Sequence, residues 1–263
     1  MKILSIDFDI IMYPCIRLYN AEVGGDDNPT LAWERIEYTR DIAQHLNYDA
    51  KILNNILTLM MKNAQNGAIF VPIQEHQEIV TYLEKTVGIE KNKDLQVTNI
   101  DFHHDIIYHD GDIVNTKYFG QSTCANWAGY LLMNDYANSV NWIKAPNSEV
   151  LSPMLANLVD MTKITISPSH SIAELPYDYD YIFFCLSPQW VPYKFHHLYD
   201  LCCTVVTMFQ EACSKDVEVF VENIIRCDAT EEIEDATLHA EVVQVDDEIV
   251  CAEVSVDSDV SEE

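Results

Sequence analysis

Three residues that could bind a metal ion lie within five positions of one another. Asp101, His103 and Asp105 follow a strand-like run at residues 95–98. In an extended segment the side chains at positions i, i+2 and i+4 point the same way, so these three would converge on one point beside a sheet. Two carboxylates and an imidazole that face one point need a cation to be stable together. These donors suit manganese, iron or zinc better than calcium.

Two other stretches could complete such a site. Near the N-terminus an apolar strand ends in Asp7 and Asp9, which would share a face. Farther along, a strand runs into a helix start that carries Glu75 and His76. Alone, a D-x-D pair is also typical of a turn or helix cap, and a histidine at a helix start is typical of a cap or a surface residue. Together the three stretches offer four carboxylates and two imidazoles, which fit two divalent ions about 3.5–4 Å apart.

The elements that must position these residues alternate between strands and helices. We expect strands over residues 2–9, 68–73, 95–101, 139–145, 163–167 and 179–187. We expect helices over residues 28–46, 49–66, 75–87, 122–135, 148–160 and 196–213, loops over 10–27 and 104–121, and a final apolar run at 217–225. The alternation predicts an α/β fold with three α/β/α layers and a mostly parallel central sheet. Sites in such folds form at the carboxyl ends of the strands.

Length and composition indicate a globular protein. The chain has 263 residues, of which 48% are hydrophobic, and this is enough for one substantial core. No apolar run of about 18 residues occurs, so we expect no membrane span, and the start of the chain has no signal-peptide pattern. The eight cysteines lack C-x-x-C spacing, so we interpret them as reduced thiols of a cytoplasmic protein.

The charge of the chain is strongly negative and unevenly distributed. A net charge of −28 argues against a nucleic-acid partner and favours either cationic partners or simple solubility. Residues 228–263 hold fourteen acidic residues and no Lys or Arg. We therefore divide the chain into an α/β domain over residues 1–227 and an acidic tail over 228–263. The tail is expected to be mobile or to form a marginal hairpin from residues 240–245 and 249–254.

The motifs resemble those of the ureohydrolase (arginase-like) superfamily, and more closely the divergent branch that includes the peptide arginases of ribosomal-peptide biosynthesis. Residues 101–105, D-F-H-H-D, look like the superfamily's D-x-H-x-D. Residues 71–78, V-P-I-Q-E-H-Q-E, are similar to the E-x-H-Q-E-type segment of that branch. Residues 125–128 and 141–143 resemble its E-N-W and V-x-W-I segments. The resemblance is best from residue 68 to residue 145.

The resemblance implies a fold like that of arginase and a site with two manganese ions. Two aspartates would bridge the ions, and each ion would be held by a further histidine and aspartate. In this chain the bridging pair would be Asp101 and Asp7, the pair on one ion His76 and Asp105, and the pair on the other ion His103 and Asp9.

The position of the D-x-D is unusual for this superfamily. The superfamily usually has this motif late in the chain, so its N-terminal place here implies a permuted strand order. The alternative to Asp7 and Asp9 would be Asp178 and Asp180. Those two lie at the start of a strand, which is the wrong end for the site.

Two further motifs depart from the arginase pattern. Where arginases have a proton-shuttling histidine in N-x-H-G, residues 126–129 read N-W-A-G; where they have a guanidinium-binding glutamate in E-x-N-P, residues 185–188 read C-L-S-P. We interpret Cys185 as an inert buried thiol and Trp127 as a packing residue. The candidates that remain for proton transfer are His104, His109, Glu75 and Asp105. The candidates for substrate contact are Asp26, Asp27, Asp110, Asp112 and Asn126.

Three functional hypotheses follow from these residues. The first is a dimanganese hydrolase that converts arginine within a precursor peptide to ornithine and urea. The second is a hydrolase of a small guanidino compound such as arginine or agmatine. The third is a non-catalytic member of the fold that binds a peptide. The two departures favour the third hypothesis, whereas the intact set of six ligands argues against it, because so many clustered acids and imidazoles are costly to hold without metal.

Overall fold

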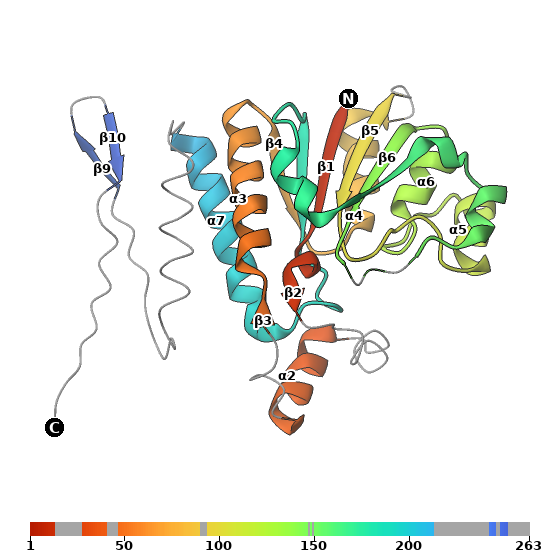
Figure 1. The fold of residues 1–263 in the computed structure, drawn as a ribbon, viewed down its shortest axis with the longest axis horizontal. Coiled ribbons are helices and arrows are strands. Elements are labelled where there is room, and N and C mark those ends of the chain that lie inside the picture. Colours follow the sequence, from red (N-terminus) through yellow and green to blue (C-terminus); the bar gives the residue numbers. More distant parts are fainter. Residues whose placement is uncertain are drawn as a thin grey trace.

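Six strands form one sheet whose order differs from their order in the chain. The computed structural model describes residues 1–13, 28–40, 47–89, 94–146, 148, 150–212, 242–245 and 248–251. The strands of the sheet are β1 (Lys2–Asp7), β4 (Ile69–Ile73), β5 (Leu95–Ile100), β6 (Ala137–Lys144), β7 (Ile164–Pro168) and β8 (Tyr181–Cys185). They lie in the order β4-β8-β1-β5-β6-β7, and every pairing is parallel. The predicted α/β fold with a mostly parallel sheet is confirmed (Figure 1).

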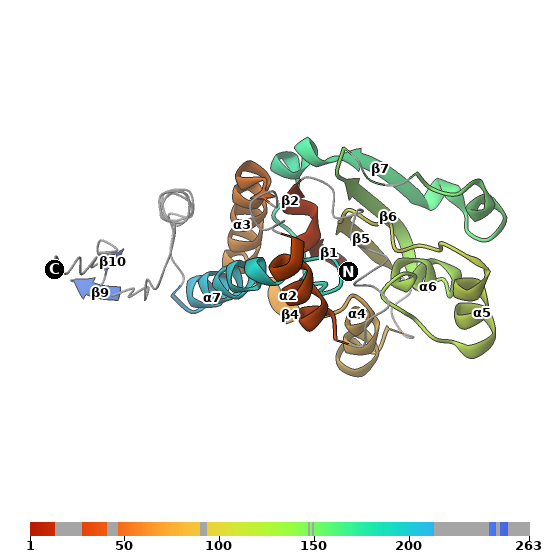
Figure 2. The ribbon, with the colours of Figure 1, turned by 90° about the horizontal axis from the view of Figure 1, so that it is seen from below.

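Helices cover both faces of the sheet. They are α2 (Pro29–Arg40), α3 (Ala50–Gln65), α4 (Gln77–Tyr82), α5 (Asp110–Phe119), α6 (Trp127–Met133) and α7 (His196–Ala212). Figures 1 and 2 show α3 and α7 on one side of the sheet and α4 and α6 on the other. Side chains alternate along β1, so Leu4 and Ile6 pack in the core that contains α3 and α7, and Ile3 packs in the core that contains α4 and α6. Apolar strands covered on both faces are typical of parallel sheets.

Several helix ends lie where capping residues predict them. The Asn28 side chain accepts a hydrogen bond from Leu31 N at the start of α2, and Asp49 accepts two at the start of α3. Helix α3 is followed by Gly67, whose φ is 95°. Helix α4 continues as a π-helical turn, η4 (Leu83–Val87), which ends at Gly88 with a φ of 68°. Because glycine adopts a positive φ without the steric cost that other residues incur, it is favoured at the ends of these two helices.

Several element predictions are wrong or only partly right, including the strand expected over 2–9, which ends at Asp7, and the loop expected over 10–27, in which β2 lies. Residues 104–121 are not a loop throughout, because α5 lies within them. This helix has no apolar stripe, so its periodicity is invisible in the sequence, but His109 and Asp112 form a capping box at its start. Residues 148–160 contain only a 3-10 helix, η6 (Pro153–Asn157), since a proline cannot lie inside an α-helix without breaking it. The helix expected over 122–135 begins only at Trp127.

The remaining elements are short. The other 3-10 helices are η1 (Phe8–Ile11), η7 (Met161–Lys163), η8 (Ser169–Glu174) and η9 (Tyr193–Phe195). Strand β2 (Met12–Tyr13) pairs with β3 (Asn47–Tyr48), and in the acidic tail β9 (Val242–Val245) pairs with β10 (Glu248–Cys251), both antiparallel. The expected element at 217–225 and most of the loop at 10–27, with Asp26 and Asp27, lie outside the described residues. None of the helices in the described ranges has the length and apolar character needed to cross a membrane.

Candidate metal centre

The register of the sheet brings the ends of four neighbouring strands to one level. In the β1–β8 pair Asp7 lies opposite Cys185, and in the β4–β8 pair Cys185 lies opposite Ile73. On the other side of β1, strand β5 pairs up to Ile100, so Asp101 follows directly at the same edge. The carboxyl ends of β4, β8, β1 and β5 therefore meet at the edge where sites form in parallel sheets.

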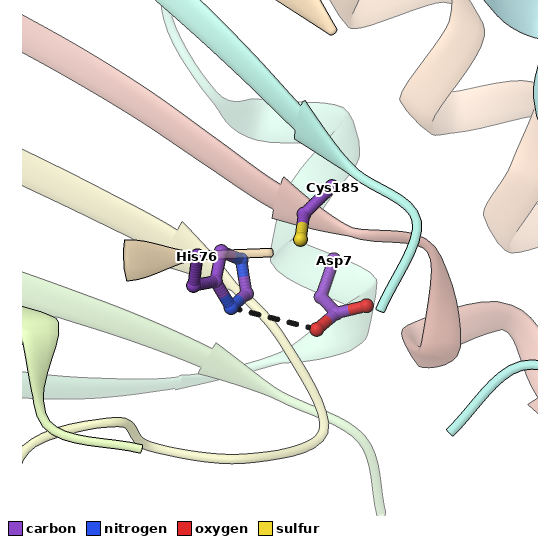
Figure 3. Close-up of side chains that lie close together, drawn as sticks. All are labelled: Asp7, His76 and Cys185. Carbon is purple, nitrogen blue, oxygen red and sulfur yellow. Dashed lines mark ion pairs between the residues drawn. The ribbon is translucent and has the colours of Figure 1, made fainter. Parts of the chain in front are cut away.

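A first group of ligand atoms surrounds the imidazole of His76. Its Nδ1 lies 2.9 Å from Asp105 Oδ2, 3.5 Å from Asp7 Oδ2 and 3.6 Å from Asp101 Oδ2. His76 lies at the N-cap position of α4, yet its side chain makes no capping hydrogen bond. Figure 3 shows this imidazole facing Asp7, with Cys185 beside them. The alternative that His76 merely caps a helix is therefore not what the structure shows.

A second group lies around His103 and shares one carboxylate with the first. His103 Nδ1 lies 3.0 Å from Asp9 Oδ2 and 3.7 Å from Asp101 Oδ1. Asp101 thus directs Oδ2 toward the first group and Oδ1 toward the second. Two sets of donors joined by one carboxylate are what a pair of divalent ions requires.

The spacing of these atoms fits the ligands of metal ions. Two donors that each lie about 2.1 Å from one ion, at an angle of about 90–110°, are about 3.0–3.4 Å apart. The separations between imidazole nitrogen and carboxylate oxygen here run from 2.9 Å to 3.7 Å. These buried clusters of aspartate and histidine could therefore hold a metal ion.

Burial makes the carboxylates of the site expensive to ionise together. Asp7, Asp9, Asp101 and Asp105 are at most 4% exposed. Burial and the charge of Asp9 raise the pKa of Asp7 to about 7, and burial with the charges of Asp105 and Asp7 raises the pKa of Asp101 well above its usual range. Among the described residues, the buried Asp9 Oδ2 has no hydrogen-bond donor with suitable geometry, although the ring of His103 lies 3.0 Å away as an ion-pair partner. A cation would stabilise the ionised carboxylates and would satisfy this oxygen.

The carboxylates around the two imidazoles likewise favour positive charge at this site. Burial lowers the pKa of His103, but the carboxylate of Asp9 outweighs burial, and the resulting pKa is about 9. Burial also opposes protonation of His76, yet Asp105 and Asp7 raise its pKa. Each imidazole is thus driven to carry a proton on the side where a metal ion would bind, and metal binding would release that proton.

Three further side chains donate hydrogen bonds to the candidate ligands. The donors are Trp127 Nε1 to Asp105 Oδ2 at 2.9 Å, Ser187 Oγ to Asp7 Oδ2 at 2.6 Å, and Asn99 Nδ2 to Asp101 Oδ2 at 3.2 Å. Such partners orient metal ligands. Sequence reasoning missed Ser187 and Asn99 and treated Trp127 as packing only. The position of Asn99 in the sequence could have indicated its role, because a residue two positions before Asp101 at the end of a strand points to the same side.

The ligands do not converge by strand alternation, and in this respect the prediction was wrong. Residues 101–103 form a bend, Asp105 has a left-handed backbone with a φ of 49°, and Asp9 lies in η1 rather than on a strand. As a result, His103 joins Asp9 whereas Asp105 joins His76. The chain has already left the sheet at Asp101, so the period of two no longer applies.

The N-terminal pair of aspartates is at the site, whereas the alternative pair is not. Lys2 N donates to Asp180 Oδ2 at 2.7 Å and Lys2 Nζ contacts Asp178, so both of these acids lie at the opposite, amino end of β1. Asp7 Oδ1 accepts a hydrogen bond from Asp9 N at 2.9 Å, so Asp7 also acts as a turn cap, and its Oδ2 faces the first group. That Asp7 would bridge the two ions as a second shared carboxylate, beside Asp101, stays a prediction.

His104 is buried in a structural role. Its Nδ1 accepts a hydrogen bond from Ile106 N at 3.1 Å, and its ring stacks on Tyr108 with the centroids 4.0 Å apart. Burial lowers its pKa to about 4. A neutral imidazole whose Nδ1 is already occupied is poorly suited to shuttle a proton.

The other proposed catalytic and substrate residues differ in their surroundings. His109 is exposed and caps α5 by accepting a hydrogen bond from Asp112 N, and Asp110 is exposed in the first turn of that helix. Asn126 is fully buried: its oxygen accepts from Thr123 N, and its amide nitrogen donates to two acceptors in α5. Asn126 therefore holds the segment before α6 rather than facing a substrate.

Cys185 is a buried thiol beside the first group. Its Sγ lies 3.4 Å from Gln74 O and near enough to Asp7 and His76 to form a third set of possible ligands (Figure 3). Burial and the charge of Asp7 raise its pKa well above the usual range, so without a metal it is a neutral thiol. Cys185, Cys124, Cys202 and Cys203 are all free thiols.

Comparisons with protein-family models, with curated proteins and with solved structures find no match to this chain. Function is therefore inferred from the geometry of the site and from the motifs.

Proposed function

We propose that this chain is a metal-dependent hydrolase that converts arginine within a peptide to ornithine and releases urea. The observation that carries the proposal is the position of Asp101, whose two oxygens face two separate groups of ligands. Hydrolases that activate water between two divalent ions use such a shared carboxylate. Manganese is the proposed ion, because carboxylate oxygens outnumber imidazoles and because the motifs resemble those of dimanganese ureohydrolases.

The protein's own residues would bind the ions and keep the ligands oriented. When bound, the two ions would lower the pKa of water enough to supply hydroxide near neutral pH. The residues that would hold the first ion are His76, Asp105 and Asp7, and those that would hold the second are His103 and Asp9, with Asp101 shared. Trp127 and Ser187 each donate to the ligand oxygen that faces the first group, which fixes those carboxylates.

The reaction consumes one water and needs no other reactant. The guanidinium carbon gains the oxygen of water, its bond to the side-chain nitrogen breaks, and that nitrogen leaves as a protonated amine. Asp105 and the exposed His109 are the candidates for handling this proton, since His104 is neutral and occupied. The products are an ornithine side chain and urea, so atoms and charge balance.

Two features favour a basic precursor peptide as the substrate. The net charge of −28 would attract a cation. A peptide also offers no free α-amino or α-carboxylate group at the modified arginine, so the enzyme would not need residues that bind those groups.

The proposal is tested by mass spectrometry of arginine-containing peptides, free arginine and agmatine after incubation with manganese-loaded protein. The matched control is Asp101→Asn, which keeps the shape of the side chain and removes its charge. Loss of 42 mass units per arginine (the mass of CH2N2, about 42 by composition) in peptides alone, absent from the control, is the expected result. Turnover of free arginine or agmatine would reassign the chain to small guanidino compounds. Metal binding without turnover would refute arginine as the substrate. If the protein neither binds metal nor turns over any of these compounds, the hypothesis of a non-catalytic peptide-binding protein would be favoured.

A further inference from the structure

The segment after β8 lies against the second group of ligands. This β8 loop, residues 187–191, places the ring of Trp190 4.4 Å from the ring of His103, measured between centroids. Helix α2 also holds this loop, because Trp33 Nε1 donates to Pro188 O at 3.1 Å. The loop is therefore held in position beside the metal centre.

The β8 loop also holds a carboxylate that the metal centre does not use. Gln189 Nε2 donates to Glu75 Oε1 at 3.0 Å, and Gln77 Nε2 donates to Glu75 Oε2 at 2.6 Å. Each oxygen of Glu75 keeps capacity for another hydrogen bond. Both partners are neutral amides, and within the described ranges no ion pair involves Glu75. The carboxylate is thus oriented, and no cationic side chain of the described residues neutralises its charge.

Glu75 is partly accessible to solvent and adjoins the centre in the chain. It is half-buried and directly precedes His76. Its charge and that of Asp105 both act on the thiol of Cys124, whose pKa is raised first by burial and then by these two charges. The β8 loop joins Glu75 to the second group, because Gln189 binds Glu75 and Trp190 contacts His103, the most exposed of the candidate ligands at 14% of its side chain. A substrate that approaches His103 would therefore come near a carboxylate that no cation of the described residues pairs with.

We propose that Glu75 binds the guanidinium group of the substrate, so that it determines specificity rather than transferring a proton. The inference rests on the proposed function and names the residue that selects a cationic side chain. The planar guanidinium donates hydrogen bonds from fixed directions and matches a carboxylate better than any other side chain. Because Gln77 and Gln189 fix both oxygens, the carboxylate is oriented before the substrate arrives.

The test compares an arginine peptide with its citrulline counterpart, in which a neutral ureido group replaces the guanidinium. Binding of acetyl-Gly-Arg-Gly-amide and acetyl-Gly-citrulline-Gly-amide to the manganese-loaded full chain is measured by stopped-flow fluorescence, which records binding before turnover. The variant is Glu75→Gln. Because Gln77 or Gln189 can turn to present its carbonyl oxygen to the new amide nitrogen while the other still donates to the remaining oxygen, this variant can keep both hydrogen bonds and lose only the charge. The matched control is Glu84→Gln, an exposed acid on η4 that contacts Tyr130.

The wild-type protein should bind the arginine peptide about ten- to a hundred-fold more tightly than the citrulline peptide, as expected for a charged hydrogen-bonded pair. Glu75→Gln should reduce this preference to about twofold or less, with manganese content unchanged, and Glu84→Gln should leave it intact. A purely structural role for Glu75 would weaken both peptides alike and would overturn the inference. So would a wild-type protein that shows no preference. If the preference depends on Glu75 but no arginine is hydrolysed, the proposed function fails while the binding role stands.

Discussion

Asp7 gives the sharpest test of the electrostatics at the metal centre. Its carboxyl is 2% exposed, and burial raises its pKa from the ordinary 3.8 to about 7. Because the folded state binds this proton more tightly than the unfolded state, the stabilisation is complete below about pH 4 and is lost as the pH rises through 7. The loss corresponds to roughly 4 kcal/mol, at 1.36 kcal/mol for each tenfold change in proton affinity.

The variant Asp7→Asn removes this loss because an amide does not ionise. Its single oxygen can accept only one of the hydrogen bonds that Asp9 N and Ser187 Oγ now donate, which costs about 1 kcal/mol. The metal-free variant should therefore be about 3 kcal/mol more stable than wild type at pH 8, or roughly 6–12 °C higher in Tm. At pH 5 the folded wild type keeps this proton and the loss is only about 1.6 kcal/mol, so the gain should shrink to less than about 1 kcal/mol.

The assay is thermal unfolding in chelator at pH 5 and pH 8, followed by titration with manganese at pH 8. At a hundredfold excess over Kd, manganese should stabilise wild type by about 2.7 kcal/mol and so raise its Tm, and it should raise the Tm of Asp7→Asn much less. The control Asp178→Asn changes an exposed acid at the opposite end of the sheet and should show neither effect. A metal-free Asp7→Asn protein no more stable than wild type at pH 8 would refute the electrostatic reasoning.

Three further changes have defined outcomes. Trp127→Phe removes the hydrogen bond to Asp105 and should weaken manganese binding about 10–100-fold in a titration followed by electron paramagnetic resonance; unchanged affinity would contradict the supporting role. Gly129→Ala should abolish folding, seen as loss of soluble protein and of circular dichroism, because a Cβ there would lie 1.8 Å from Ile106 O in the backbone; wild-type yield would show that the backbone can shift. Cys185 should resist iodoacetamide in native protein and react after unfolding, as judged by peptide mapping, since burial raises its pKa; rapid native labelling would contradict its burial.

The strands and the ligands at their ends were predictable because local sequence determines them. Strands β1 and β8 are covered on both faces and are predominantly apolar, and β5 contributes Leu95, Val97 and Ile100 to the two cores. Asp7 ends β1, Asp101 directly follows β5 and His76 lies shortly after β4, and the strand ends of a parallel sheet share one edge. Residue type and position therefore identified the candidate ligands without knowledge of the strand order.

The residue pattern alone did not predict how the candidate ligands group, and only the family resemblance implied the pairs His76 with Asp105 and His103 with Asp9. The grouping depends on turns after the strands, above all on the left-handed backbone of Asp105, and on a strand order that places β8 between β1 and β4. Ser187 reaches Asp7 only through that order, across a separation that no local pattern encodes. Helix α5 was missed for a different reason: capping at His109 rather than an apolar stripe defines it.

The place of β1 in the sheet has a consequence for the way the protein is made. Strand β1 is synthesised before the other strands of the sheet, yet it lies in the middle of the sheet, and one of its two neighbours is β8, which ends at Cys185. Until β8 is synthesised and inserted, β1 and β4 have no strand between them, and Asp7 lacks the hydroxyl of Ser187. Pairings this distant along the chain form late and slowly. Metal uptake should therefore follow completion of the α/β domain, so that chains truncated before β8 are made without a working centre.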